Sequence, residues 1–419
     1  MGDAGGDCPW RHIQAPVAGR SLRIALYHHL PSGGALSHFS DVARALAAAG
    51  HRLSLFAPES AELCFAGFSD ILEERVIFPR QPWRPGGPGL APLNPLRYRL
   101  YLEALRHQER VQAQAIAAGG FDGLYLGQCR TWTEPPLLAH LPPDLPAVLF
   151  CAEPKRAFHD AWGRAAMERW PWWKKLWREP TVRWMRAVQQ RNILCARKVL
   201  CNSRYSKARI EEAYPGCKPE VNYIGVDTEF FCPADVPRED LLVSVGAFEP
   251  SKNHRHALEV AALRPAGRRF KVVLIGDRES GGGVEELRQR ARALDVALDL
   301  RVRVPRAELR DVLRRARAMV YCPFQEPFGI AAIESQACGT PVLGRAEGGL
   351  LETIEDGRTG RLLLDDPCPY AEQLVVWNAD PGSYQQFSRQ AREHILAHFD
   401  RRALTAHTVA SITAALATR

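Results

Sequence analysis

One stretch of the sequence, EPFGIAAIESQACGTPVLGRAEGGLLETIEDGRTG at 326–360, places two glutamates eight positions apart, Glu326 and Glu334. The pattern predicts a loop that leads into a helix beginning near Phe328. Backbone N–H groups at the start of a helix attract phosphate, and Gly329 lets the backbone approach a ligand closely. A carboxylate before the helix can accept hydrogen bonds from sugar hydroxyls, and one two turns into the helix can hold both hydroxyls of a ribose. A single helix glutamate often only faces water, but the ordered series of Gly, Pro and Glu favours a binding site.

The same stretch resembles the donor-binding signature of the retaining glycosyltransferases of family 4, the glycosyl transferases group 1, which have the GT-B fold. The family's E-x7-E pattern matches Glu326 and Glu334. Its later G-x-P-V and G-G-x-x-E elements match Gly339, Pro341, Val342, Gly348, Gly349 and Glu352. The resemblance implies that Glu326 contacts the donor sugar and that Glu334 contacts the ribose. It also implies that the sugar and the phosphates lie near the backbone amides of Phe328, Gly329 and Ile330.

A second block, SVGAFEPSKNHRHAL, follows an apolar run and resembles the family's G-R-x-x-x-x-K element. In the family the Arg and the Lys neutralise the donor pyrophosphate. Lys252 matches the lysine, and a solvated surface lysine is the alternative interpretation. Ala247 stands where the family usually has Arg, which removes a bidentate phosphate contact that Lys cannot replace geometrically. Arg255 and Arg278 are the nearby candidates to compensate.

The first half of the chain carries weaker motifs. Gly33 and Gly34 resemble the family's glycine loop beside the transferred sugar, although a Gly-Gly pair can also be a simple turn. Further blocks resemble a mannosyltransferase-like subgroup, with Ala152 at a position where that subgroup often has His. The polar residues of these blocks predict the acceptor side; they are Gln128, Arg130, Glu153 and Arg156.

The resemblance implies a reaction without an enzyme nucleophile, in which the acceptor attacks from the front face and the donor phosphate assists. Catalysis then rests on positioning and on stabilising the departing pyrophosphate, with Glu326 and Lys252 as the catalytic residues. His28, His29 and His38 could serve as general bases, but a structural or orienting role is favoured for His28 and His29. Without a D-x-D pattern or clustered ligands, the sequence predicts no metal, and a nucleotide sugar is a substrate, so no cofactor is expected.

The net charge of +8 is concentrated in one segment. Residues 153–218 contain 16 Lys and Arg but six Asp and Glu, together with six of the ten Trp. Pro171 and Pro180 are predicted to break this segment into short helices. Trp beside Lys and Arg on a short amphipathic helix suits an anionic membrane surface, and the expected contacts are Trp172, Trp173, Lys174, Lys175 and Trp177. The alternative is that these Trp pack against the first domain; a nucleic-acid partner is not expected, because the donor signature already explains the site.

Short apolar runs alternate with helix-period segments along the whole chain, which predicts parallel strands with right-handed crossovers. A helix is expected from Ser37 to Ala49. The predicted strands are Leu22–Tyr27, Arg52–Ala57, Gly123–Leu126, Ala147–Cys151, Lys198–Asn202, Leu241–Val245, Lys271–Ile275, Leu298–Val302, Ala318–Tyr321 and Pro341–Leu343.

The expected fold is α/β of the GT-B type: two Rossmann-like doubly wound domains facing each other across a cleft, with a C-terminal helix that crosses back to the first domain. The expected parts are a loose leader (1–20), an N-terminal acceptor domain (21–215) with a basic Trp-rich insertion at about 158–191, a linker (216–240), a donor domain (241–387) and returning C-terminal helices (388–419). The cleft would be the binding site, because ligands of α/β sheets bind beyond the C-terminal strand ends.

Composition excludes several classes of protein. Hydrophobic residues make up 46% and charged residues 24%, which is ordinary for a globular chain and not for a disordered or fibrous one. The 11 Cys form no C-x-x-C pair, which argues against a disulfide framework or a zinc site. No uncharged apolar run approaches 18 residues, so no membrane-spanning segment is expected. The scattered Cys favour a reducing cytoplasm, and the expected location is cytoplasmic, either free or peripheral on the inner face of the cytoplasmic membrane.

These observations predict a retaining, hexosyltransferase-type glycosyltransferase. It would move a sugar from a UDP- or GDP-sugar to a membrane-associated acceptor, such as a lipid-linked or surface-polysaccharide intermediate. Two alternatives stay open. One is a transferase acting on a soluble small molecule. The other is a catalytically silent nucleotide-sugar-binding or scaffold protein, which the substitutions at Ala247 and Ala152 suggest.

Overall fold

The computed structural model describes residues 20–31, 33–62, 67, 69–79, 94–160, 167–169, 171–277 and 282–417. The described chain divides into two compact units. The first unit runs to Asn222 and includes the chain from Thr405, and the second unit is Tyr223–Leu404.

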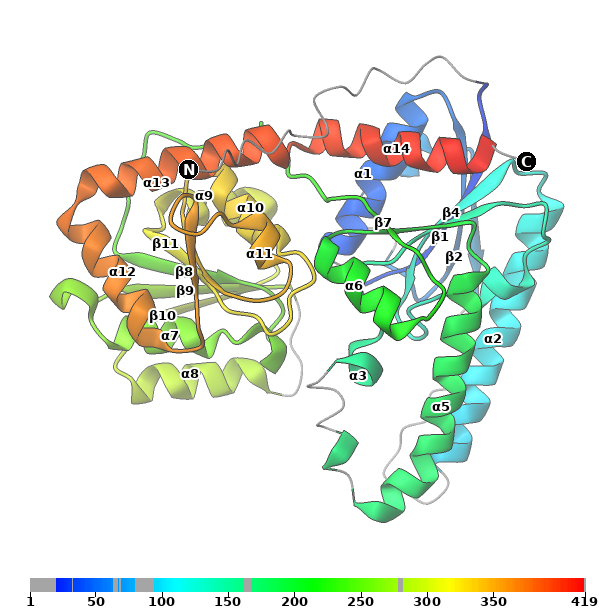
Figure 1. Ribbon diagram of the computed structural model, residues 1–419, viewed down its shortest axis with the longest axis horizontal. Helices are drawn as coiled ribbons and strands as arrows, with labels where there is room; N and C mark the ends of the chain where they lie inside the picture. The colour runs from blue at the N-terminus through cyan, green and yellow to red at the C-terminus, as the bar shows by residue number, and fades with distance from the viewer. Residues whose placement is uncertain are drawn as a thin grey trace, which may run out of the picture. The chain divides into compact units, whose positions relative to one another are not determined.

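The first unit contains a seven-stranded parallel sheet in the order β3-β2-β1-β4-β5-β6-β7 (Figure 1). Its strands are β1 (Arg23–His29), β2 (Arg52–Pro58), β3 (Glu74–Phe78), β4 (Gly123–Cys129), β5 (Ala147–Phe150), β6 (Lys198–Cys201) and β7 (Glu220–Val221). Its helices are α1 (Gly34–Ala48), α2 (Asn94–Ala118), α3 (Arg156–His159), α5 (Trp172–Leu194) and α6 (Arg204–Ala213), with short turns η1 (Ser69–Ile71) and η3 (Pro136–His140). The central strands are buried along almost their whole length, as expected for a parallel sheet covered on both faces.

The second unit contains a six-stranded parallel sheet in the order β10-β9-β8-β11-β12-β13. Its strands are β8 (Leu241–Val245), β9 (Lys271–Gly276), β10 (Leu298–Val302), β11 (Ala318–Tyr321), β12 (Val342–Arg345) and β13 (Gly360–Leu363). Its helices are α7 (Arg255–Ala262), α8 (Gly283–Ala293), α9 (Arg306–Arg315), α10 (Ile330–Ala337), α11 (Leu350–Thr353), α12 (Pro367–Ala379) and α13 (Pro381–His398), with turns η4 (Pro250–Lys252) and η5 (Pro265–Gly267).

The last helix, α14 (Arg401–Ala417), returns to the first unit. Ser411 Oγ donates to Glu220 Oε1 over 2.7 Å. A Cβ on Gly123 would lie 2.5 Å from Leu416 Cδ2, so the helix packs directly on β4. The two GT-B features that the sequence predicts, paired Rossmann-like sheets and a returning C-terminal helix, are thus present.

Each predicted strand is found within a few residues of its expected bounds, but three strands were not predicted. β3 is exposed or half-buried along its length, β7 has two residues, and β13 ends its sheet. Edge strands bury little surface, so they lack the continuous apolar run that identifies a central strand.

The prediction that Pro180 breaks the Trp-rich segment is wrong, because α5 continues through it from Trp172 to Leu194. The second half of α5 packs with α2 in a cluster built on Leu102, Trp132 and Met185, and the two helices lie side by side (Figure 1). Burial of this face supplies the stability that the proline removes.

In the region of the predicted C-terminal helices, 388–419, the described chain contains the end of α13 and α14, and the two helices are separated by Phe399 and Asp400. Asp400 Oδ1 accepts from the N–H of Arg402 over 2.9 Å, as a helix N-cap does. Val226 occupies the break, accepting from Arg401 N and donating to Phe399 O.

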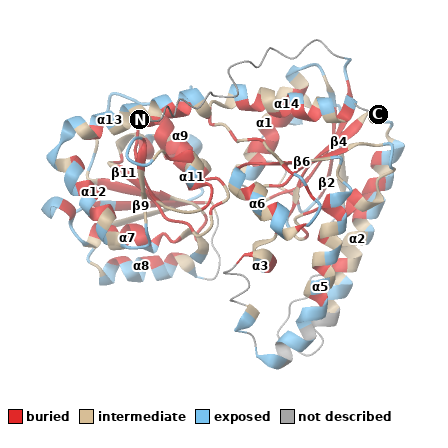
Figure 2. Ribbon diagram, viewed as in Figure 1, coloured by how far each residue is buried: buried red, intermediate tan, exposed pale blue. Residues whose placement is uncertain are grey.

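Figure 2 shows that burial is concentrated on the strands and on the helix faces turned toward them. Phe248, Leu258 and Trp377 belong to the core of the second unit, and Tyr27, Leu126 and Tyr214 to that of the first. In each unit, this core supports the strands whose C-terminal ends lead into the loops with predicted site residues.

Candidate functional site

Lys252 and Glu326 form an ion pair in the second unit, with Lys252 Nζ 2.7 Å from Glu326 Oε2. Lys252 ends η4 after β8, and Glu326 lies in the loop after β11. The neighbouring strands β8 and β11 are parallel, so their carboxyl ends bring the two loops together. Both side chains are largely buried, with 21% and 11% of their surface exposed. The structure therefore joins the two residues that the sequence predicts to be catalytic.

The backbone of Gly348 and Gly349 packs directly against the backbone of the Glu326 loop. A Cβ on Gly348 would lie 2.4 Å from Glu326 O, and one on Gly349 would lie 2.3 Å from Pro327 O. The N–H of Gly349 donates to Glu326 O over 2.7 Å. Gly348 also has a positive φ of 66°. Only glycine fits at such a backbone-to-backbone contact, which gives the G-G element its physical reason.

His254 braces the loop that presents Lys252. Its Nδ1 lies 3.0 Å from Ser244 Oγ, and its Nε2 lies 3.1 Å from the carbonyl oxygens of Gly246 and Ala247. Burial lowers the pKa of His254 to about 4, so the ring is neutral, with Nε2–H donating to the carbonyls and Nδ1 accepting from Ser244. The stem of Lys252 crosses Gly246, where an added Cβ would lie 3.3 Å from Lys252 Cγ.

Ala247, at the position where the family often has Arg, is 95% buried. Of the two predicted compensating arginines, Arg255 lies in this region: it is exposed at the start of α7 and donates to Asn253 Oδ1 over 3.2 Å. Arg278 lies outside the described residues. A second cation, Arg345, stacks over Phe324, and the N–H of Phe324 donates to the carbonyl of Ser251 beside Lys252.

The α10 helix begins at Ile330, two residues later than predicted, because Gly329 with φ 95° forms its N-cap. In its first turn, Ala332 N and Ile333 N donate to Gly329 O. The N–H groups of Ile330 and Ala331 come directly after the Glu326 loop, where a helix start can bind phosphate. The ring of Phe328 does not face a ligand: it is 99% buried and packs against Tyr223 and Phe399. Only the backbone of Phe328 remains available to a donor.

Glu334 is a buried carboxylate that lies little more than one turn into α10, not two. Arg306 Nη2 lies 3.0 Å from Glu334 Oε1 and is the partner that the sequence did not identify. Burial raises the pKa of Glu334, and Arg306 opposes that rise. The guanidinium of Arg306 also lies over the ring of Phe231, 5.0 Å from its centroid. Arg306 is 28 residues from Glu334 in the sequence, and no local pattern points to it.

In the first unit, Gly33 and Gly34 open α1 directly after β1. Gly33 has a φ of 131°, which favours glycine, and its carbonyl accepts from Ser37 N. His38, in the second turn of α1, is buried, and burial lowers its pKa to about 4. His38 Nε2 has no hydrogen-bond partner among the described residues. It lines a small hollow together with Gln128 and Ala152, the residue at the position of the family's histidine.

Three of the four predicted acceptor residues brace one another. Gln128 Nε2 donates to Glu153 O over 2.7 Å, and Gln128 Oε1 accepts from the N–H of Ala152 over 3.0 Å. Arg156 Nε lies 3.1 Å from Glu153 Oε2 and 3.0 Å from Asp160 Oδ2. These contacts hold the loop between β5 and α3 in place.

The fourth residue, Arg130, lines a cavity of about 560 Å³ at the C-terminal ends of β1, β2 and β4. His29 Nε2 lies 3.0 Å from Ser60 Oγ in its wall. The cavity is mostly polar; its hydrogen-bonding side chains include His29, Glu59, Ser60, Tyr101, Gln108, Glu109, Gln112, Arg130 and Thr131. Its position at the C-terminal strand ends and its volume are typical of small-molecule sites.

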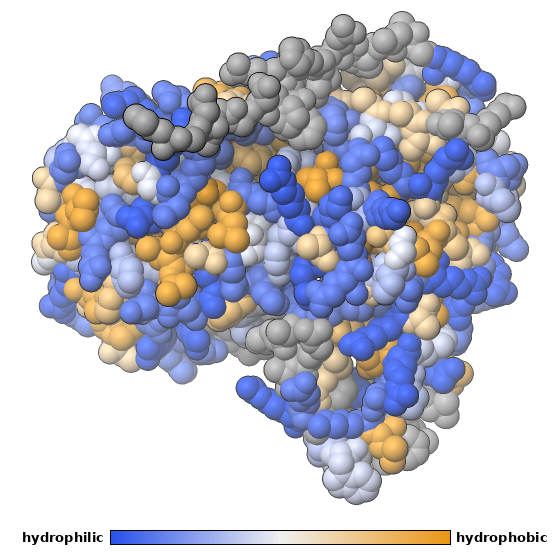
Figure 3. All heavy atoms as spheres, viewed as in Figure 1, coloured by the Kyte–Doolittle hydropathy of each residue, from blue (hydrophilic) through white to orange (hydrophobic). Residues whose placement is uncertain are grey.

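The first turns of α5 are exposed. Trp172 is 77% exposed and Leu176 is 66% exposed, and Lys175 is also exposed. The side chains of Trp173, Lys174 and Trp177 lie outside the described residues. Farther along, Trp184 packs edge-on against Trp132, so the packing interpretation holds for this Trp. Figure 3 shows a largely hydrophilic face with apolar groups scattered over it, and no described helix is both long and apolar enough to span a membrane.

Solved structures share this fold. Sucrose-phosphate synthase from Thermosynechococcus elongatus superposes with a TM-score of 0.72 at 18% identity, over 96% of this chain and 100% of that chain. HepE from Anabaena, in complex with UDP-glucose, superposes with a TM-score of 0.66 at 18% identity, over 94% and 100% of the respective chains. The likeness at this identity is one of fold.

Sequence relatives and family models give the assignment. The D-inositol 3-phosphate glycosyltransferase of Kribbella flavida is 35% identical over 201 residues, which cover 42% of this chain and 46% of that protein. The chain spans about half the length of the curated relatives it matches. The model "Glycosyltransferase Family 4" matches residues 32–230, and the model "Glycosyl transferases group 1" matches residues 227–394. Between them the two matches take in every strand of both sheets except β1, and the chain therefore belongs to glycosyltransferase family 4, with a second half of the group 1 type.

Proposed function

We propose that this chain transfers a sugar from a nucleotide-sugar donor to a hydroxyl of a soluble, polyhydroxylated acceptor, with retention of the anomeric configuration. The observation that carries the proposal is the Lys252–Glu326 pair beside the start of α10. A cation, a carboxylate and the N–H groups at the start of a helix lie close together there, a combination that can bind a sugar pyrophosphate.

On the donor side, Lys252 and the N–H groups at the start of α10 would neutralise the pyrophosphate as the glycosidic bond breaks. The acceptor hydroxyl would attack the same face of the sugar and pass its proton to the departing phosphate oxygen. Glu326, freed from Lys252 by the incoming phosphate, would accept hydrogen bonds from the sugar. Glu334 would bind the ribose through the oxygen that Arg306 leaves available.

On the acceptor side, the cavity at Arg130 supports a small molecule. Its polar wall suits several hydroxyl groups, and Arg130 suits an anionic group such as a phosphate. The curated relatives are named for D-inositol 3-phosphate. We therefore favour a soluble acceptor of this class over the membrane-associated acceptor that the sequence suggests, and UDP-glucose, the donor bound by HepE, as the first donor to test.

The experiment measures nucleotide release and glycoside formation over a panel of UDP-glucose, UDP-N-acetylglucosamine and GDP-mannose. GDP-mannose represents the mannosyltransferase-like subgroup. The acceptors are inositol 3-phosphate, free inositol and a lipid-linked sugar. We expect a product with a phosphorylated polyol, and Arg130→Gln should weaken use of inositol 3-phosphate far more than use of free inositol. Product formation with the lipid-linked sugar alone would overturn the soluble-acceptor proposal.

A membrane-associated acceptor is the second candidate, and the exposed Trp172 and Leu176 beside Lys175 favour it. An amphipathic helix end with these residues can rest in an anionic headgroup layer. It would place the enzyme at the inner face of the cytoplasmic membrane, near surface-polysaccharide intermediates.

A silent nucleotide-sugar-binding protein is the third candidate, suggested by Ala247 and Ala152. His38 argues against it, because its ring lines the same hollow as Ala152 and could replace the missing histidine; its Nε2 has no partner among the described residues. His38→Ala should lower kcat and should have little effect on the affinity for the nucleotide. Donor binding in calorimetry without turnover on any acceptor would instead support the silent protein.

A further inference from the structure

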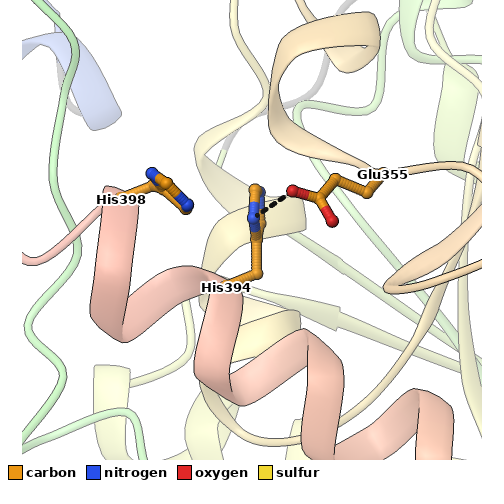
Figure 4. Close-up of side chains that lie close together, drawn as sticks. All are labelled: Glu355, His394 and His398. Atoms are coloured by element: carbon orange, nitrogen blue, oxygen red, sulfur yellow. Dashed lines mark ion pairs between the residues drawn. The ribbon is translucent and has the colours of Figure 1, made fainter. Parts of the chain in front are cut away.

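Glu355, His394 and His398 form a compact cluster in the second unit, and Figure 4 shows His394 between the other two. Each side chain offers one potential ligand atom, and these atoms all lie within 4.8 Å of one another. His394 and His398 are four residues apart on α13, so they share one face of the helix. Glu355 comes from the loop between α11 and β13.

Within this cluster, His394 is the buried residue with the fewest hydrogen-bond partners. It is 93% buried, and its Nδ1 faces Glu355 Oε1 at 3.0 Å. Its Nε2 makes no hydrogen bond with any described residue, and the Glu355 carboxylate is the one partner of Nδ1 among those residues. Buried polar atoms in proteins are nearly always paired. A cation bound by the imidazole and the carboxylate would give this buried ring a further partner.

We propose that Glu355, His394 and His398 bind one divalent transition-metal ion, with zinc as the favoured metal and solvent completing the coordination. Two imidazole nitrogens with one carboxylate oxygen form a ligand set that suits zinc, cobalt and nickel. Calcium and magnesium prefer oxygen ligands alone and do not fit this set.

The geometry requires a modest closure. Ligand atoms at 2.0–2.2 Å from a tetrahedral ion lie roughly 3.3–3.6 Å apart. The separations in the cluster, which reach at most 4.8 Å, must therefore shrink by up to about 1.5 Å. His398, near the end of α13, is only half-buried and has room to turn. Glu355 Oε2 already accepts from Arg358 over 2.6 Å, and this bond would orient the carboxylate as an outer-shell partner does. The charge of Arg358 should keep the affinity moderate.

The position of the cluster gives the ion a structural role. The ring of His394 lies 5.4 Å from that of Phe399, and Phe399 lies 5.8 Å from Phe328 in the Glu326 loop. The ion would fasten the Glu355 loop to the end of α13 beside this aromatic cluster. It takes no part in sugar transfer, so the proposal does not rest on the proposed function.

The test uses untagged full-length protein from which metal has been removed with a chelator. Zinc is titrated in competition with a chromophoric zinc indicator, and Co²⁺ is titrated by visible absorption. We expect one equivalent of zinc, a rise in Tm at saturation, and a Co²⁺ spectrum typical of four- or five-fold coordination. His398→Gln and Glu355→Gln should each weaken zinc binding at least tenfold, whereas His107→Gln, at an exposed histidine of α2, should not.

The test uses His398 and Glu355 because they are half-exposed, so their substitution should leave the fold intact. Substitution of the buried His394 would disturb the fold as well as the metal site. Circular dichroism verifies that each variant is folded. Equal zinc affinity in the wild type and in folded His398→Gln would overturn the proposal. So would a wild-type protein that binds neither Zn²⁺ nor Co²⁺ at millimolar metal.

Discussion

Lys252 Nζ and Glu326 Oε2 lie 2.7 Å apart although 74 residues separate them in the chain. The pair holds the ammonium beside the loop that leads into α10. In the proposed function, the donor pyrophosphate would take the place of the carboxylate beside Lys252. Each side chain fixes the position of the other. The glycines that contact the Glu326 loop and the hydrogen bonds of His254 hold the two loops in place.

Lys252→Ala should lower kcat by about 10²–10³-fold, because it removes a charge aimed at the departing pyrophosphate. Steady-state kinetics with the donor identified in the panel measures this effect. Lys271→Ala, which removes a half-exposed lysine paired with Asp299, is the matched control and should leave kcat unchanged. Equal activity of the two variants would place the phosphate contact elsewhere.

Gly348→Ala should be more harmful than Gly357→Ala. Both glycines have a positive φ, 66° and 74°, so each substitution carries a left-handed backbone cost of about 1–2 kcal/mol. Gly357 has open space around a new Cβ, whereas at Gly348 that atom would meet Glu326 O at 2.4 Å. Denaturant unfolding should show a greater loss of stability for Gly348→Ala, and donor KM should rise in that variant alone. Equal losses in the two variants would show that the contact with Glu326 is unimportant.

Arg306→Ala should destabilise the fold by about 1–2 kcal/mol at pH 7, because it leaves the buried Glu334 carboxylate without its partner. Burial already raises the pKa of Glu334, and losing Arg306 should raise it further. The penalty should therefore shrink as the pH falls toward 4 and the carboxyl becomes protonated in both states. Arg310→Ala is the control, since Arg310 stacks on Phe230 as Arg306 stacks on Phe231. Urea unfolding at pH 4 and pH 7 compares them; a pH-independent loss in Arg306→Ala would contradict the ion-pair explanation.

Glu134→Gln should become increasingly stabilising as the pH rises from 5 to 8. Burial raises the pKa of Glu134 to about 8, so between its ordinary value and about 8 the folded state binds a proton that the unfolded state has released. The free energy of unfolding then falls with rising pH, by up to about 1.4 kcal/mol per pH unit. Glutamine does not ionise, so the variant should not lose this part of the free energy of unfolding as the pH rises. Urea unfolding at pH 5, 6.5 and 8 measures the difference, with the exposed Glu286→Gln as control; a constant difference would refute the assignment.

The Trp172→Ala, Leu176→Ala double variant should lose binding to anionic vesicles in flotation if α5 contacts a membrane. These are exposed apolar side chains beside Lys175, and the apolar contribution to interfacial binding grows with buried area. Leu364→Ala, at an equally exposed leucine of the second unit, is the control. Unchanged flotation of the double variant would remove the main support for a membrane-associated acceptor.

The sequence alone predicts most of the elements that carry the site. Buried parallel strands such as Leu241–Val245 and Ala318–Tyr321 appear as continuous apolar runs with the same bounds in the structure, and the E-x7-E spacing identifies Glu326 and Glu334. Local propensity misleads at Pro180, where packing of α5 against α2 outweighs the helix-breaking tendency of proline.

The tertiary structure decides which residues meet. Arg306 reaches Glu334, Arg130 lines a cavity apart from the other predicted acceptor residues, and His394 faces Glu355. These partners lie on different strands, loops and helices, and their proximity follows from the strand order of each sheet and from the path of α13. Strand order is set by the burial of whole elements against one another, a property that no local stretch of sequence contains.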